Sequence, residues 1–246
     1  MIHPHAVTEG GFAYLPGSAN PFSNGVVALT GHALNRVRLR KALPLAQGLE
    51  LAAAYLSTRN RPPAALAACE LRSPAPMSRE DFRAFGVTYS SLLRANGFGA
   101  ESAFPVGRSN MAPLYNPPPT NTLFAFTFAA PAETVGRPDF VISGKPENTE
   151  NPAGIVAAGD TSPQGMKAKA RFVIGALRQR VSDLGCSWAD ITGAQAYTVH
   201  SLDPVMDELH AASLTSTGLT LFPAYPPVIG LDFEIDVRSV SNELAA

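Results

Sequence analysis

Two carboxylates lie two residues apart near the end of the chain. Residues 226–240, PPVIGLDFEIDVRSV, alternate polar and apolar side chains after Gly230, which predicts a half-buried strand with a polar face. Glu234 and Asp236 share that face. A carboxyl group whose pKa is suited by partial burial can donate a proton and accept one in turn. Glu234 is therefore a candidate acid–base residue, with a solvated surface carboxylate as the alternative, and for Asp236 we favour a structural role.

The cysteines and histidines do not show the spacing of metal or redox motifs. Cys69 and Cys186 belong to no CxxC motif and are expected to be unpaired thiols. His3 and His5 form an HxH pair close to the N-terminus, where such a pair is more often incidental than a ligand set. We therefore expect no metal site and no cofactor.

The composition restricts the possible partners. The chain has 246 residues, 46% hydrophobic and 16% charged, which is enough for one large core or two ordinary ones. A net charge of −1, with no basic stripe of interleaved aromatics, argues against nucleic acid. Residues 1–17 lack the charged and apolar regions of a signal peptide, and no run of about 18 apolar residues predicts a transmembrane helix. We expect a cytoplasmic protein that binds neither nucleic acid nor a membrane.

The second half of the chain predicts the order β–α–β–α–β. The apolar run 138–145 ends in Ser-Gly, as a buried strand before a tight turn does. The Gly-, Asn- and Pro-rich segment 146–159 predicts a loop. A helix then runs from a cap at Thr161 or Ser162 to Gly185, with apolar side chains at helical spacing. A strand at 191–202, a short helix near 204–214 and the strand at 226–240 complete the set.

The first half repeats this order more loosely. Strands are expected at 24–32, 63–73 and 122–130, and helices within 39–56 and after the capping residues Ser78 and Asp81. Three short motifs recur in the same order in both halves: LTGH (29–32) and ISGK (142–145), AFPVGR (103–108) and LFPAY (221–225), FTF (126–128) and FEI (233–235). This recurrence indicates a duplication. We predict an α+β fold of two lobes, 1–131 and 132–246, each a mixed sheet with helices on one face.

The set of motifs resembles the RidA/YjgF family, also called UK114, with the first lobe as a degenerate copy. The family pattern is a strand ending in SGQ, a long helix, a strand, a short helix, FPAR and a strand containing EIE. The second half offers ISGK, TGAQAYTVHSLD (192–203), FPAY (222–225) and FEID (233–236) in that order. The resemblance implies β-α-β-α-β lobes like those of chorismate mutase, a barrel-like association of their sheets, and a homotrimer with ligand clefts.

Taken position by position, the resemblance implies an acid and a carboxylate-binding arginine. The FPAR arginine of the family holds the substrate carboxylate in a fork. In the second half, the position of this arginine is occupied by Tyr225, which can donate one hydrogen bond but cannot neutralise a carboxylate. In the first half, Arg108 is offset by one residue from the equivalent position of the motif. Arg108 is therefore the expected carboxylate ligand, with a solvated loop arginine as the alternative. The first glutamate of EIE, close to the hydrolytic water in the family, matches Glu234 here and Thr127 in the first half.

The Ser-Gly pair of the family brings a hydroxyl and backbone N–H groups close to the ligand, and glycine permits that approach. The matching positions are Ser143, Gly144 and Lys145 in the second half and Thr30, Gly31 and His32 in the first. Lys145 and His32 could each bind a second carboxylate or act as an acid, with plain solvation as the alternative. The long loop 109–121 could wall a cleft. Its weaker candidates are Asn110, Tyr115 and Asn116.

Three functions are compatible with this pattern. The leading hypothesis is an enzyme that hydrolytically deaminates a reactive enamine or imine carboxylate and releases ammonia. Family members of aromatic catabolism act on 2-aminomuconate-type unsaturated dicarboxylates, and the cationic candidates Arg108, Lys145 and His32 suit such a small-molecule substrate. The alternatives are a chorismatase-like hydrolase, which is also two-lobed but longer, and a non-catalytic small-molecule binding protein, which the loss of the FPAR arginine favours.

Overall fold

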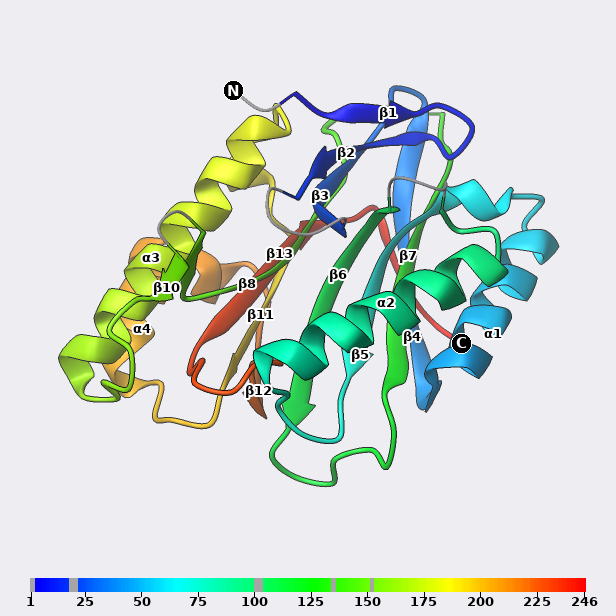
Figure 1. Ribbon diagram of the computed structural model, residues 1–246. Coiled ribbons are helices and arrows are strands. Elements are labelled where there is room, and N and C mark those ends of the chain that lie inside the picture. Colours follow the sequence, from blue (N-terminus) through cyan, green and yellow to red (C-terminus); the bar gives the residue numbers. More distant parts are fainter. Residues whose placement is uncertain (1–2, 18–21, 100–103, 134–135, 151–152) are drawn as a thin grey trace.

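Strands form most of the protein. The computed structural model describes residues 3–17, 22–99, 104–133, 136–150 and 153–246. Its α-helices are α1 (Leu45–Thr58), α2 (Arg79–Ala95), α3 (Pro163–Asp183) and α4 (Met206–Ala211) (Figure 1). Its strands are β1 (His5–Val7), β2 (Phe12–Pro16), β3 (Phe22–Ala28), β4 (His32–Pro44), β5 (Leu66–Arg72), β6 (Phe104–Pro113), β7 (Thr122–Pro131), β8 (Phe140–Pro146), β9 (Asn148–Glu150), β10 (Ala153–Ile155), β11 (Gly193–Thr198), β12 (Leu219–Tyr225), β13 (Glu234–Ser239) and β14 (Asn242–Ala245). None of the described helices is long and apolar enough to cross a membrane.

Two units of the same connectivity share one large sheet. The strand order is β4-β7-β5-β6 in the first unit and β8-β13-β11-β12 in the second. In both units the chain runs strand, helix, strand, helix, strand, strand, and the pairs β5–β6 and β11–β12 are parallel while the other neighbours are antiparallel. The units join where β12 pairs with β6, Tyr225 opposite Ala112. This repetition supports the predicted duplication, and the α+β class with mixed sheets is confirmed.

Helices cover one face of each unit, as predicted. α1 and α2 pack on the first unit, and α3 and α4 pack on the second, each against its own apolar cluster. Figure 1 shows α3 and α4 on one side of the strands and α1 and α2 on the other. The helix starts follow the predicted caps. Ser78 Oγ accepts from the Asp81 N–H at 3.0 Å, and Ser162 Oγ accepts from the Gly165 N–H at 3.2 Å.

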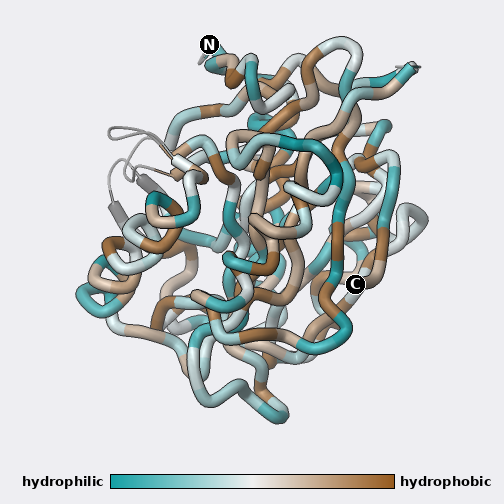
Figure 2. The backbone as a smooth tube through the Cα atoms, turned by 90° about the vertical axis from the view of Figure 1, so that its right-hand side faces the viewer, coloured by the Kyte–Doolittle hydropathy of each residue, from teal (hydrophilic) through white to brown (hydrophobic). Residues whose placement is uncertain are grey.

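The opposite faces of the two units meet in a buried polar network. Polar and apolar segments alternate along the strands in the middle of the molecule (Figure 2). Arg36 of β4 donates to the Glu70 carboxylate at 2.6 and 2.8 Å. Gln195 of β11 donates to both Glu70 (3.1 Å) and Asp236 (3.2 Å), and the Tyr197 hydroxyl also donates to Asp236, at 2.5 Å. Because buried polar groups are costly unless paired, this network fixes how the units pack. Asp236 has the structural role predicted for it.

The N-terminal segment differs from the prediction. The expected strand 24–32 is in fact β3, a turn at Leu29–Gly31 and the start of β4. β3 pairs with β8 of the second unit and also with β6 of the first, so that β3, β8, β13, β11, β12 and β6 close a ring. The first-unit counterpart of β8 is therefore β4, and β1 to β3 are an addition to both repeats. The boundary between residues 131 and 132 remains a prediction.

Two predicted loops also contain strands. β6 extends into the segment 109–121, which leaves only its later part as a loop. The predicted loop 146–159 contains the hairpin of β9 and β10. The LFPAY motif was noted in the sequence without a strand prediction, and it lies in the strand β12. Ala103 of the AFPVGR motif lies outside the described residues.

Candidate active site

A cavity of about 370 Å³ lies between the two units. Its walls come from β3, β6 and α2 on one side, and from β8, the β9–β10 hairpin and the start of β13 on the other. Its volume suits a small molecule. Among the described residues that line it, the cationic side chains are Arg79, Arg83, Arg108, Lys145 and Arg180, and the single acidic one is Glu234. This excess of positive charge favours a ligand that carries more than one negative charge.

Glu234 is a buried carboxyl at the first position of β13. Its side chain is 2% exposed, and its Oε2 has no hydrogen-bond partner among the described residues. Burial raises the pKa of Glu234 well above its usual range, with Asp236 and Glu147 adding to the effect and Lys145 and Arg108 opposing it. This shift favours the protonated, neutral form of the Glu234 carboxyl over the carboxylate. A raised pKa of this kind is typical of residues that transfer protons in catalysis.

Arg108 of β6 faces the cavity from an aromatic box. Its guanidinium carbon lies 4.4 to 5.7 Å from the ring centroids of Phe22, Phe82, Phe85 and Tyr89. Three of these rings come from one face of α2. The Nη1 of Arg108 is buried without a hydrogen-bond partner among the described residues. Burial lowers the pKa of Arg108, but an arginine keeps its charge at physiological pH. The arrangement presents a desolvated, pre-oriented cation to the cavity.

Ser143 and Gly144 hold the cavity wall together. The Ser143 Oγ donates to the Ser23 carbonyl (2.7 Å) and accepts from the Arg108 N–H (3.0 Å), so it joins β3, β6 and β8. The Gly144 N–H donates to Ser109 Oγ at 3.1 Å. A Cβ at position 144 would collide with Oε1 of Glu234, so glycine makes room for the acid.

Four further cationic side chains surround these groups. Lys145 donates through Nζ to the Asn148 carbonyl (2.6 Å) and to Asn148 Oδ1 (3.1 Å), which shapes the turn after β8. Arg79 and Arg83 are exposed and lie four residues apart on α2, so they share the helix face that lines the cavity. This arginine pair was not among the predicted site residues, although its helical spacing is visible in the sequence. Arg180, also missed, donates to the Ser143 carbonyl at 3.3 Å.

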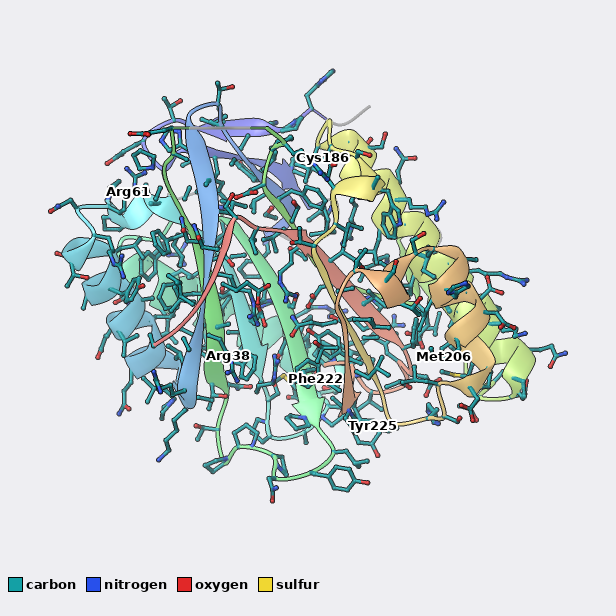
Figure 3. The ribbon with its side chains drawn as sticks, turned by 180° about the vertical axis from the view of Figure 1, so that it is seen from behind. Arg38, Arg61, Cys186, Met206, Phe222 and Tyr225 are labelled. Atoms are coloured by element: carbon teal, nitrogen blue, oxygen red, sulfur yellow. The ribbon has the colours of Figure 1, made fainter. Side chains whose placement is uncertain are left out.

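The remaining candidates lie elsewhere. The turn into β4 contains Thr30, Gly31 and His32, and none of them lines this cavity. The motif match had paired the strand before this turn, β3, with β8, whereas the strand that corresponds to β8 is β4. Tyr225 ends β12 at the lower rim of the molecule, partly exposed, and does not line it either (Figure 3).

The candidates of the segment 109–121 divide between the cavity and the surface. Asn110 lines the cavity, and its Nδ2 donates to Ser73 Oγ at 2.9 Å. Tyr115 is exposed, and neither it nor Asn116 lines the cavity. The described residues also contain no cluster of three or more His, Cys, Asp or Glu side chains that could hold a metal ion.

The whole chain is similar to deaminases of muconate-type compounds. Residues 4–244 match the family described as 2-aminomuconate deaminase CnbZ. The chain belongs to this family. It is 36% identical over 248 residues to the 2-amino-5-chloromuconate deaminase of Comamonas testosteroni, a similarity that covers 98% of both chains. These relationships confirm the resemblance inferred from ISGK, FPAY and FEID, including its 2-aminomuconate branch.

Solved structures extend the similarity of this CnbZ-family chain at the level of fold. A chorismatase shares 13% identity with a TM-score of 0.54 and covers 93% of this chain and 81% of its own. The YjgF protein of E. coli covers 44% of this chain and 84% of its own, at 15% identity and a TM-score of 0.32. The chorismatase likeness spans both units of this chain, and at this identity it concerns the fold and not the reaction.

Proposed function

We propose that this CnbZ-family enzyme hydrolytically deaminates a 2-aminomuconate-type enamine dicarboxylate and releases ammonia. The full-length similarity to a 2-amino-5-chloromuconate deaminase and the family match support the reaction class. The observation that carries the proposal is the buried acid Glu234 in a cavity whose other charged side chains are cationic.

The reaction needs one acid–base group and one water molecule. In this mechanism protonated Glu234 gives its proton to the enamine carbon, which converts C=C–NH2 into a C=N bond. The Glu234 carboxylate then takes a proton from the water that adds to the C=N carbon. Return of that proton to nitrogen breaks the C–N bond, so that enamine and water yield a carbonyl compound and ammonia. The hydroxyl proton lost as the carbonyl forms restores Glu234.

The cations divide between the two ends of a dicarboxylate. In the proposal, Arg108 binds one carboxylate through a charged, forked hydrogen bond, which its unpartnered Nη1 favours. The arginine pair Arg79 and Arg83 of α2 binds the other carboxylate. Lys145 and Ser143 shape the wall between these ends through the contacts described above.

Ammonia release by the purified protein tests this function. Freshly generated 2-aminomuconate is incubated with wild type, Glu234→Gln and, as a control for removal of a surface carboxylate, Glu50→Gln on the exposed face of α1. Release by wild type and Glu50→Gln that is lost in Glu234→Gln supports the proposal. Binding without ammonia release by a folded wild type would favour the binding-protein alternative, and consumption of chorismate would favour the hydrolase.

The assembly and location belong to the same proposal. From the RidA/YjgF resemblance we propose a homotrimer that works in the cytoplasm. Size-exclusion chromatography with light scattering tests the trimer, and a mass of one or two chains at assay concentration would exclude it. Cell fractionation tests the location.

A further inference from the structure

A chain of ionisable side chains adjoins the segment that leads into Glu234. Glu147, after β8, and Lys169 of α3 are fully buried, and their Oε1 and Nζ lie 3.4 Å apart. Lys169 Nζ also contacts Asp232 Oδ2 at 2.6 Å, and Asp232 Oδ1 lies 3.0 Å from Nε2 of the partly exposed His200. These four residues do not line the cavity. Buried charges of this kind are stable only when paired, so the chain is a defined structural unit.

Glu147 is the member of this chain that reaches the catalytic strand. Its Oε1 accepts from the backbone N–H of Asp232 at 2.6 Å, and its Oε2 accepts from the backbone N–H of Phe233 at 3.2 Å. These are the two residues that precede Glu234, where β13 begins. Charge-assisted hydrogen bonds to two consecutive amides restrict the backbone strongly. Glu147 therefore holds the backbone immediately before Glu234.

The same residue ties this strand to the other side of the cavity wall. The Glu147 carbonyl accepts from the Val156 N–H at 2.9 Å, next to the end of β10. Its neighbours in sequence, Lys145 and Asn148, are joined by the 2.6 Å hydrogen bond described above. One side chain and its backbone thus connect β8, the β9–β10 hairpin and β13.

We propose that Glu147, which lies beside Lys169 and holds the two backbone N–H groups before Glu234, is a positioning residue for Glu234 and adds a carboxylate next to the acid. The inference rests on the proposed function, in which Glu234 transfers the proton. A nearby negative charge disfavours ionisation of a second carboxyl group. Glu147 therefore acts with burial and Asp236 to raise the pKa of Glu234, against the opposing charges of Lys145 and Arg108.

The protein contains a matched control for a purely structural role. Asp139 is also a buried carboxylate whose oxygen accepts from two backbone N–H groups, those of Leu34 at 2.8 Å and Ser241 at 2.9 Å. It does not line the cavity. Replacing Asp139 by Asn removes a comparable pair of charge-assisted hydrogen bonds from the fold without changing the charge behind Glu234.

The experiment compares Glu147→Gln with Asp139→Asn in the full-length enzyme, following kcat and KM across pH together with Tm. Both variants should lower Tm by several degrees, because each weakens two charge-assisted hydrogen bonds. Only Glu147→Gln should move the alkaline limb of kcat, toward lower pH and by about half a unit or more. The sign follows because removing the negative charge lowers the pKa of Glu234, so the acid form is lost earlier as pH rises.

A Glu147→Gln profile that coincides with wild type, or a shift that Asp139→Asn reproduces, overturns the proposal. If Glu147→Gln does not fold, Glu147→Asp carries the test. It keeps the charge and shortens the reach, so kcat should fall about tenfold or more with KM little changed and the alkaline limb in place. A wild-type kcat in Glu147→Asp would then overturn the proposal. Glu234→Gln is measured in parallel, because activity retained there refutes the proposed function and not this inference alone.

Discussion

Removing the charge of Arg108 should abolish substrate capture while leaving the protein about as stable as before. In Arg108→Met an unbranched apolar side chain replaces the stem of the arginine, and the guanidinium beside the aromatic box is lost. The buried, unpartnered Nη1 costs the unliganded protein roughly 1–3 kcal/mol. Cation–π attraction to the four ring centroids, 4.4 to 5.7 Å from the guanidinium carbon, stabilises the protein by about 1–2 kcal/mol. Because these free energies nearly cancel, Tm should stay within about 4 °C of wild type.

The expected loss of activity is much larger. A desolvated arginine that binds a carboxylate through two charged hydrogen bonds contributes about 3–4 kcal/mol to binding of substrate and transition state. That free energy corresponds to a fall in kcat/KM of about 100- to 1000-fold. Arg108→Lys should lie between wild type and Arg108→Met, because a lysine keeps the charge but not the fork.

The assay is ammonia release at several substrate concentrations, combined with thermal unfolding of the same samples. Arg94→Met is the matched control, since the Arg94 guanidinium carbon lies 5.1 Å from the Phe104 ring centroid but Arg94 does not line the cavity. Arg94→Met should retain wild-type kcat/KM. The reasoning would be refuted if Arg108→Met lowered Tm by more than about 10 °C while kcat/KM stayed within threefold of wild type.

Three further outcomes follow from the cavity. Arg79→Gln and Arg83→Gln should each raise KM for a dicarboxylate about tenfold but leave a monocarboxylate imine such as 2-iminopropanoate unaffected; equal effects on both substrates would contradict the two-ended binding. Because the pKa of Glu234 is raised and its acid form donates the proton, kcat should fall as pH rises through that pKa, and a kcat that climbs steadily with pH would exclude this role. His32→Ala and Tyr225→Phe should keep kcat/KM within about twofold of wild type, since neither side chain lines the cavity, and a large loss in either would place the substrate elsewhere.

The sequence was sufficient for those parts of the site that local chemistry encodes. Glu234 belongs to an alternating strand, and Ser143 and Gly144 end an apolar run, so each could be located from its own neighbours. Arg108 was found because a motif recurs in both halves, and the structure brings it to the same cavity as Glu234. The helix caps at Ser78 and Ser162 were also predictable, because capping depends on a few consecutive residues.

Other parts depend on contacts between distant segments. The match of Thr30 to Ser143 failed because β3, an additional strand, lies next to β8, and four-residue motifs cannot distinguish it from the true counterpart β4. Glu147 lies in a stretch that reads as a polar loop, and its contacts become visible only in the structure, where Asp232 and Phe233, just before β13, supply the backbone N–H groups. The aromatic box likewise depends on distant segments, because its rings come from β3 and α2 while Arg108 itself belongs to β6.

The two units of this enzyme contribute different side chains to the cavity. Because the two units pack against each other, their interface can place an arginine of one repeat near a carboxyl group of the other. Arg108 of β6 and Glu234 of β13 line the same cavity in this way. The motif match gives Tyr225 as the counterpart of Arg108 and Thr127 as the counterpart of Glu234, so the match pairs the cation with an uncharged phenol and the acid with an alcohol. The corresponding helices also differ in length, with 6 residues in α4 against 17 in α2. The longer helix, α2, carries three of the rings around Arg108 and the arginine pair Arg79 and Arg83 at the cavity. A single site for a dicarboxylate needs these side chains from one repeat only.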